Sequence, residues 1–302
     1  MIQKINKFLF EQTNFLDKIR LTKIIAIFCI INLIVIAPDM YEIYGNKGLI
    51  SPDLNSYFLS WYQPVLSWIT DVFVNLGLSQ NFSLLLVFFI YLVSLISIVL
   101  GKNRVFFSIV AWIIHLMMVN SSYMFSYGAD YFISLVLFIN VFISISTVLK
   151  GELSITIYSF FIRFLQVHMC LVYFFAGFGK ILGTDWFDGN ALWLVLSAHA
   201  PSTINYLTPL LSFPIIFKVL SWSVFFEQLV YPIMIYVPRV RKHMLITTIV
   251  LHIFIAIFMN FYTFAGIMIL LNYVAFGHYL HNGKSFVIKP LKRKFYKTSR
   301  AT

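Results

Sequence analysis

The sequence predicts an all-α protein, a polytopic bundle of transmembrane helices with about eight spans and additional interfacial helices. Composition is the first reason: the 302 residues are 60% hydrophobic and only 11% charged, whereas a soluble domain is about a quarter charged. The second reason is a series of apolar stretches long enough to cross roughly 30 Å of hydrocarbon. The third is that the basic residues fall between alternate stretches.

The apolar stretches mark the expected spans one by one. They cover residues 21–38, 82–100, 104–119, 129–149, 154–182, 213–236, 243–260 and 263–280. Residues 54–74 are rich in Trp, Tyr and Phe, which is typical of a helix in the membrane interface or of a short re-entrant segment. The first stretch resembles a signal-peptide core, but the long segment before it carries acids as well as lysines, which favours an uncleaved span.

The basic residues set the expected orientation. Lys and Arg total 22 against 11 Asp and Glu, and they gather at one side of the membrane if the spans alternate. Because cytoplasmic loops carry the excess of Lys and Arg, both termini are predicted to be cytoplasmic. The abundance of Asn, Lys, Ile and Phe is typical of an AT-rich bacterial genome, so the expected location is a bacterial inner membrane. The same placement favours membrane lipid as a partner and argues against nucleic acid.

Three regions are expected along the chain. Residues 1–20 form an amphipathic cytoplasmic N-terminus, residues 21–282 the transmembrane domain, and residues 283–302 a basic tail that lies against anionic headgroups or remains a solvated end. Cys29 and Cys170 lie inside apolar runs and are interpreted as packing residues, so neither a disulfide framework nor a metal site is expected. The sequence has no internal repeat, which disfavours a secondary transporter.

Four ionisable residues lie inside expected spans. Counted from the cytoplasmic helix ends at about 1.5 Å per residue, Arg163, Glu227, His115 and His252 all lie roughly 12–17 Å deep. An isolated charge at this depth costs several kcal/mol, and an opposite charge facing it offsets much of that cost. We therefore predict that Arg163 and Glu227 are partners, with His252 or His115 nearby. The pair either holds the helix register or forms the floor of a cavity or a proton path.

A second polar group is expected near the outer ends of the spans. It consists of Asn120, Ser121, Ser122, Tyr127, Gly128, Asp130, Lys180 and Asn260. Asp130 is placed at a helix N-terminus, which favours an anion. Lys180 allows two interpretations: it snorkels to the outer headgroups, or a dry site favours its neutral amine, which can accept a proton. Gly177, Gly179 and Gly183 would let another backbone or a ligand approach this face.

The segment around Lys180 also resembles a known family. YFFAGFGKILGTDWFDGNAL at 173–192 is similar to the signature helix of the HTTM ("horizontally transferred transmembrane") family, which includes the membrane part of vitamin K-dependent γ-carboxylase. Supporting matches are YGNKGLISPD at 44–53, NSSYMFSYGAD at 120–130, RFLQ at 163–166, His252 and FAGIMIL at 264–270.

The resemblance implies a function. In the carboxylase the lysine of the motif is the proposed base that deprotonates reduced vitamin K, and it matches Lys180. The chain would then use Lys180 on a quinol or a peptide in an outward-facing cavity, with Asn120, Asp130, Gln166, Trp186 and His252 as lining or supporting residues. A reduced quinone is the only cofactor that the resemblance suggests.

Two differences from the carboxylase argue against true γ-carboxylation by this chain. Ser121 stands where the carboxylase has a histidine, and the carboxylase's large lumenal domain has no counterpart in this sequence. Short bacterial members of the family include one that is needed to mature a secreted peptide toxin. The alternative function is therefore a non-catalytic maturation or export factor for a secreted precursor peptide, or for a small partner protein encoded nearby.

Overall fold

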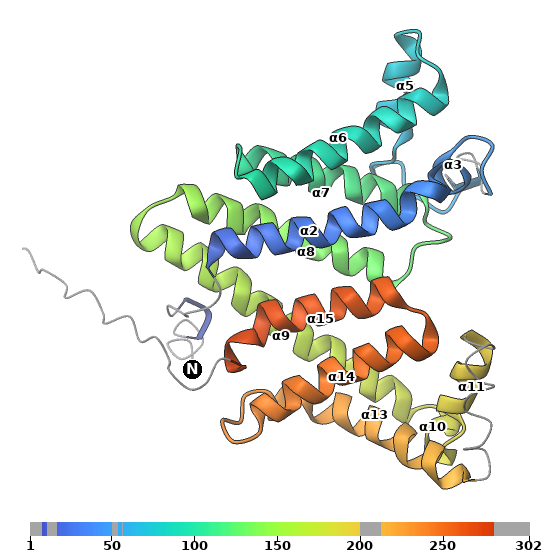
Figure 1. Cartoon of the computed structure of the whole chain (residues 1–302), viewed down its shortest axis with the longest axis vertical. Coiled ribbons are helices and arrows are strands. Elements are labelled where there is room, and N and C mark those ends of the chain that lie inside the picture. Colours follow the sequence, from blue (N-terminus) through green and yellow to red (C-terminus); the bar gives the residue numbers. More distant parts are fainter. Residues whose placement is uncertain (1–7, 11–16, 50–53, 56, 200–212, 281–302) are drawn as a thin grey trace, which may run out of the picture.

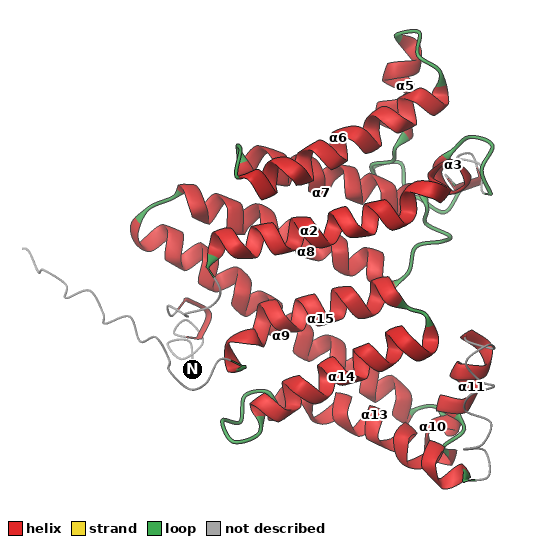
Figure 2. Cartoon of the chain, viewed as in Figure 1, coloured by secondary structure: helices red, strands yellow, loops and turns green. Residues whose placement is uncertain are grey.

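The apolar stretches fold as helices, and the described residues contain no strand (Figure 2). The computed structural model describes residues 8–10, 17–49, 54–55, 57–199 and 213–280. Most of the expected N-terminal region 1–20 and the whole expected tail 283–302 lie outside these residues.

All eight helices predicted as spans are present, within a few residues of their expected bounds. They are α2 (Lys18–Ile36), α6 (Gln80–Leu100), α7 (Arg104–Ser121), α8 (Gly128–Val148), α9 (Gly151–Ile181), α13 (Pro214–Met234), α14 (Arg241–Met259) and α15 (Tyr262–Phe276). Local sequence explains several ends. The side chains of Asp17 and Ser79 accept backbone N–H groups of α2 and α6. Gly101 ends α6 with a φ of 83°, which glycine adopts without strain.

Shorter helices lie at one end of the bundle. They are α3 (Met40–Tyr44), α5 (Ser67–Asn75), α10 (Thr184–Asp188) and α11 (Ala191–His199), and 3₁₀ turns follow α2 (Ala37–Asp39) and α15 (Gly277–Tyr279). The prediction of one interfacial helix over 54–74 is wrong in extent, because Ser67 begins the only long helix there and turns precede it. Pro64 lacks the N–H that a continuous helix would need at that point.

The long helices form two layers of four. One layer contains α6, α2, α15 and α14 in that order, and the other contains α7, α8, α9 and α13 (Figure 1). Consecutive helices run in opposite directions, so the starts of α2, α7, α9 and α14 lie at one end. We call this the basic end, because Lys18, Arg104, Lys150 and Arg241 mark those starts. The opposite end holds α3, α5, α10 and α11 (Figure 1).

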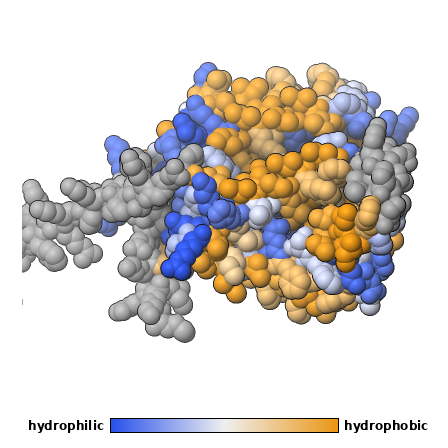
Figure 3. All heavy atoms as spheres, turned by 60° about the horizontal axis from the view of Figure 1, so that its bottom comes forward, coloured by the Kyte–Doolittle hydropathy of each residue, from blue (hydrophilic) through white to orange (hydrophobic). Residues whose placement is uncertain are grey.

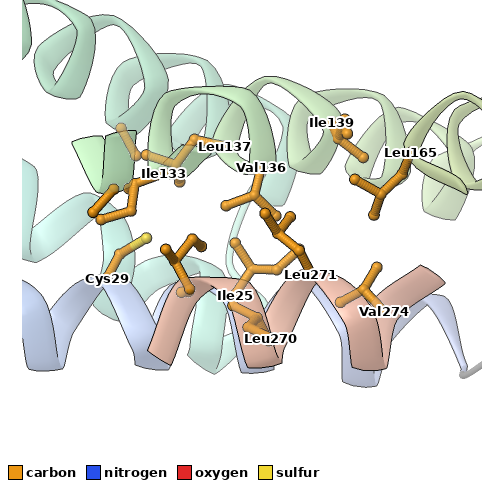
Figure 4. Packing of buried hydrophobic residues seen from close by; sticks show 14 of the residues in the cluster. Ile25, Cys29, Ile133, Val136, Leu137, Ile139, Leu165, Leu270, Leu271 and Val274 are labelled. Carbon is orange, nitrogen blue, oxygen red and sulfur yellow. The ribbon is translucent and has the colours of Figure 1, made fainter. Parts of the chain in front are cut away.

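Branched aliphatic side chains fill the space between the layers. Ile133, Val136 and Leu137 of α8 face Ile25 and Cys29 of α2, and α15 contributes Leu270, Leu271 and Val274 (Figure 4). Cys29 is buried in this core, as predicted for a packing residue.

Six of the long helices are long and apolar enough to cross a membrane: α2 with its continuation to Tyr44, α6, α7, α8, α9 and α14. Helices α13 and α15 are not among them, and α15 has only 15 residues. On the face that Figure 3 shows, hydrophobic residues cover much of the middle, and hydrophilic residues gather toward the two ends. A soluble protein could not expose so wide an apolar surface, so the chain is a multi-pass helical membrane protein.

Candidate functional site

Lys180 lies in the last turn of α9, at the end opposite the basic one. Its half-buried ammonium donates a hydrogen bond to the Ala176 carbonyl oxygen (3.3 Å) and lies 5.0 Å from the ring centroid of Trp186. Among the residues that the structure describes, no carboxylate lies within ion-pair distance of it, although Asp185 and Asp188 follow closely in the sequence. The cation is therefore held by a helix C-terminus and an aromatic face.

Lys180 shares one face of α9 with Tyr173 and Gly177, because spacings of four and seven residues return to the same side of a helix. This face packs against α13. The rings of Tyr173 and Tyr231 lie 4.1 Å apart, and a Cβ added at Gly177 would lie 2.8 Å from the backbone nitrogen of Leu229. The expected close approach of another backbone is confirmed at Gly177, whereas Gly179 faces open space.

A buried hydrogen-bond network extends from this face across four helices. Tyr231 of α13 donates to Oδ1 of Asn272 (2.6 Å), and Nδ2 of Asn272 donates to the Tyr173 hydroxyl (2.6 Å). That hydroxyl lies 2.8 Å from Nε2 of His252 on α14. All four side chains are buried. Such a network satisfies polar groups that hydrocarbon cannot, so it ties α9, α13, α14 and α15 together.

The network ends at His252. The Tyr173 hydroxyl accepts from Asn272 and lies against Nε2 of His252, and the tautomer of the imidazole sets which of these two groups donates. The other ring nitrogen, Nδ1, is buried and has no hydrogen-bond partner among the described residues.

The predicted partnership of Arg163 and Glu227 is wrong. Glu227 accepts a hydrogen bond from the Thr248 hydroxyl (2.9 Å), and the described residues contain no ion pair between Glu227 and Arg163. The register of α9 and α13 explains the error. With Tyr173 opposite Tyr231, Arg163 lies ten residues toward the basic end and Glu227 four residues the other way, roughly 20 Å apart along the bundle. Depths counted from helix ends missed this offset because α9 is 31 residues long.

Arg163 instead belongs to the basic end. Its Nη1 donates to Oε1 of Gln166 (2.8 Å), and its guanidinium lies 4.7 Å from the Phe8 ring centroid. Gln166 is fully buried and also donates to the Ala275 carbonyl oxygen (2.7 Å), which joins α9 to α15. Burial and, after it, the nearby charges of Arg241 and Arg163 together lower the pKa of His278 to about 4.

This geometry predicts additive energetics for Arg163 and Glu227. Residues far apart with no shared partner contribute independently to stability. The double variant Arg163→Met/Glu227→Gln should lose the sum of the two single losses, to within about 0.5 kcal/mol. SDS titration of the four proteins in mixed micelles measures this. A double variant that loses much less stability than the sum of the two single losses would support the predicted pair of Arg163 and Glu227.

Asn120, Asp130 and His115 form a separate group on α7 and α8. Asp130 accepts the Tyr127 backbone N–H (2.9 Å), so the prediction of a carboxylate at a helix N-terminus is confirmed. His115 is buried between the Tyr91 hydroxyl (Nδ1, 3.4 Å) and the Asp130 carbonyl oxygen (Nε2, 3.3 Å). Asn120 donates to the Pro64 carbonyl oxygen (2.8 Å). Of the expected site residues, only Trp186 contacts Lys180. The others are dispersed: His252 is in the buried network, Gln166 is beside Arg163, Glu227 is beside Thr248, and Asn120, Asp130 and His115 are on α7 and α8.

Lys180 does not line either of the two best-formed hollows in the described part of the chain. One is an apolar groove of about 440 Å³ between Phe8, α9 and α13, and Cys170 lines it. The other is a cavity of about 90 Å³ beside α3, α5 and α6. Within the described residues, no group of three or more His, Cys, Asp or Glu is placed to bind a metal ion.

Sequence reasoning missed most of the buried network. Only His252 was singled out, because ionisable residues inside a span draw attention and neutral ones do not. Tyr231 and Asn272 belong to no quoted motif, and Tyr173, which opens the motif at 173–192, was not itself singled out. The single signal available was an Asn inside the short apolar run 262–276, where an unsatisfied amide would be costly.

The fold and these polar groups define the class as a multi-pass helical membrane protein with a buried polar network. Comparison of the chain with protein-family models, curated proteins and solved structures finds no match. The similarity to the HTTM family therefore rests on the quoted motifs alone and stays a prediction.

Proposed function

We propose that the chain is a membrane enzyme of the HTTM type in which Lys180 acts as a general base on a quinol or a peptide. The observation that carries this proposal is the environment of the amine. Lys180 is half-buried and is held by one carbonyl oxygen and one aromatic face, with no carboxylate beside it in the described residues. The carbonyl oxygen and the ring favour the ammonium less strongly than a carboxylate would. Partial burial favours the neutral amine, so this lysine is placed to release and accept a proton.

The chain's own residues would position the Lys180 amine and shield one side of it from water. Gly177 lets α9 lie against the backbone of α13 one turn below Lys180, which fixes the direction of the amine. The Trp186 ring covers one side of the ammonium and presents a flat apolar surface, which suits an aromatic quinol ring or an aromatic side chain of a peptide. A positioned base of this kind contributes typically about 10²–10⁴-fold to a proton transfer.

A second function is favoured by a different observation. The segment before α5 and the first turn of α5 expose large aromatic side chains at the end that also holds Lys180: Tyr57, Phe58, Trp61, Tyr62 and Trp68. Such residues suit the membrane interface and can also hold a hydrophobic peptide. The chain would then be a non-catalytic maturation or export factor for a secreted precursor peptide, and Lys180 would have a structural role.

Exchange of Lys180 for Arg separates the two functions. Arginine keeps the charge and the stacking on Trp186 but does not become a neutral base. Lys218 is a matched control, because its ammonium lies 5.2 Å from the Trp222 ring centroid in the same kind of contact. Mass spectrometry of the peptides secreted by cells with and without the chain gives the readout, and immunoblots check that the variants reach the membrane.

If the chain is the proposed enzyme, Lys180→Arg should give the peptide profile of cells that lack the chain. Lys218→Arg should give the wild-type profile. A wild-type profile from Lys180→Arg would eliminate the base and leave the maturation factor. If a neighbouring gene encodes a small secreted peptide, that peptide is the first product to follow.

A further inference from the structure

The cavity beside α3, α5 and α6 is built from uncharged polar groups. Helices α3 and α5, which line it, lie at the end of the bundle opposite the basic one (Figure 1). The polar side chains that line it are Tyr44, Asn46, Asn55, Ser67, Thr70, Gln80, Asn81 and Ser121. Four of these are carboxamides, and none of the described lining residues is an acid, a lysine, an arginine or a histidine. The site therefore offers both donors and acceptors but no charge.

Part of the wall is firmly held. The backbone N–H of Leu66 donates to the Ser121 hydroxyl (2.8 Å), and Asn120 donates to the Pro64 carbonyl oxygen (2.8 Å). Nδ2 of Asn55 donates to the Asn120 carbonyl oxygen (2.8 Å). These bonds fasten the segment before α5 to the end of α7, so the cavity does not depend on a loose loop.

Other polar groups of the wall are incompletely bonded. Oδ1 of Asn55 is buried and has no hydrogen-bond partner among the described residues, although only 4% of this residue is exposed. Nε2 of Gln80 makes only long contacts, at 3.4 Å to Oδ1 of Asn46 and 3.4 Å to the Thr70 hydroxyl. Because buried polar groups are normally satisfied, the unpaired Oδ1 of Asn55 is placed to receive a donor, and the partly exposed Gln80 amide has a donor to offer the same ligand.

We propose that this cavity binds a neutral amide, either a small free amide or an amide group of a peptide at this surface. An amide supplies the N–H that Asn55 lacks and the carbonyl oxygen that Gln80 can donate to. A volume of about 90 Å³ is that of roughly three water molecules, which admits one amide group with a short side chain. An ion would find no opposite charge in the described wall to repay its desolvation. The cavity is separate from Lys180 and does not depend on the base.

Saturation-transfer NMR on the full chain in lipid nanodiscs tests this site with defined probes. Acetamide is the free amide, N-acetylglycine N-methylamide represents a peptide, and acetate and methylammonium are charged analogues of similar size. We expect signals from the amides and none from the charged probes at equal concentration. A larger signal from the peptide analogue assigns the site to a peptide, and a larger signal from acetamide assigns it to a free amide.

Two variants and a control locate the signal. Asn55→Leu removes the unpaired acceptor and should weaken amide binding by about fivefold or more. Thr70→Val changes one wall hydroxyl at nearly constant volume and gives a weaker loss, which keeps the test open if Asn55→Leu does not fold. Asn75 is exposed at the end of α5 and does not line the cavity, so Asn75→Leu should bind as the wild type does.

The contrary results are equally definite. Equal signals from acetamide and acetate, or unchanged amide binding in both folded Asn55 and Thr70 variants, would overturn the proposal. Lys180→Arg should keep full amide binding, so a failure of the base and a failure of this site are told apart.

Discussion

Replacing Asn272 by Leu should destabilise the bundle by about 2–4 kcal/mol. Asn272 is fully buried and joins the Tyr231 hydroxyl, the Tyr173 hydroxyl and the Met268 carbonyl oxygen at 2.6, 2.6 and 2.8 Å. Leu fills a similar volume but leaves two tyrosine hydroxyls without this partner in hydrocarbon, where each hydrogen bond contributes about 0.6–1.7 kcal/mol. Unfolding in SDS followed by tryptophan fluorescence measures the loss.

Asn140 gives a matched control for this variant. It is also a fully buried asparagine in a long helix, but it makes one 3.5 Å contact to the Ser108 hydroxyl, and its Oδ1 has no partner among the described residues. Asn140→Leu should therefore be neutral or slightly stabilising, because it removes an unsatisfied buried acceptor. Equal losses in the two variants would mean that the network across the four helices adds no stability of its own.

The second large effect is expected at Gly177. An added Cβ would lie 2.8 Å from the backbone nitrogen of Leu229 and 2.9 Å from its Cγ, and a backbone atom cannot move aside as a side-chain end can. Gly177→Ala should push α9 and α13 apart and cost about 1–3 kcal/mol, and Gly177→Val should cost more. Thermal unfolding in detergent, followed by far-UV circular dichroism, gives the stability.

Gly179 is the control on the same helix. A Cβ there meets nothing within 4 Å, so Gly179→Ala should be neutral or stabilising through its better helix propensity. Because Lys180 lies one turn from Gly177, the proposed function also predicts loss of the secreted-peptide profile in Gly177→Ala at a temperature where the variant is still folded. A Gly177→Ala protein as stable as Gly179→Ala would contradict the close packing of α9 on α13.

Much of the fold was predictable from local pattern. Apolar runs bounded by capping residues such as Asp17 and Ser79, or by Gly101, located all eight long helices, and the lysines and arginines at alternate ends predicted their up-and-down order. The predicted interfacial helix was too long, because its aromatic composition suggested one helix although Pro64 interrupts it. These signals are local: each depends on a few neighbouring residues and on the thickness of a bilayer.

The candidate site was predictable only in part. Asp130 at a helix start and the close approach at Gly177 follow from residue type and position, and both are found. The pairing of Arg163 with Glu227 failed, because equal counts from helix ends do not give equal depth when helices differ in length and register. The hydrogen bonds of Tyr173, Tyr231 and Asn272 could not be predicted, since an Asn in an apolar run shows that a partner is needed but not which residue it is.

The sequence by itself determined that this protein is a helical membrane protein, where its eight long helices lie to within a few residues, and which end of the bundle is basic. A chain with so few charges cannot bury enough of its apolar surface within itself, and the amino-acid composition alone shows this. Only the tertiary structure decided which polar groups meet. Contacts between α9, α13, α14 and α15 depend on register and on the small size of Gly177, which are settled by packing among residues far apart in the chain.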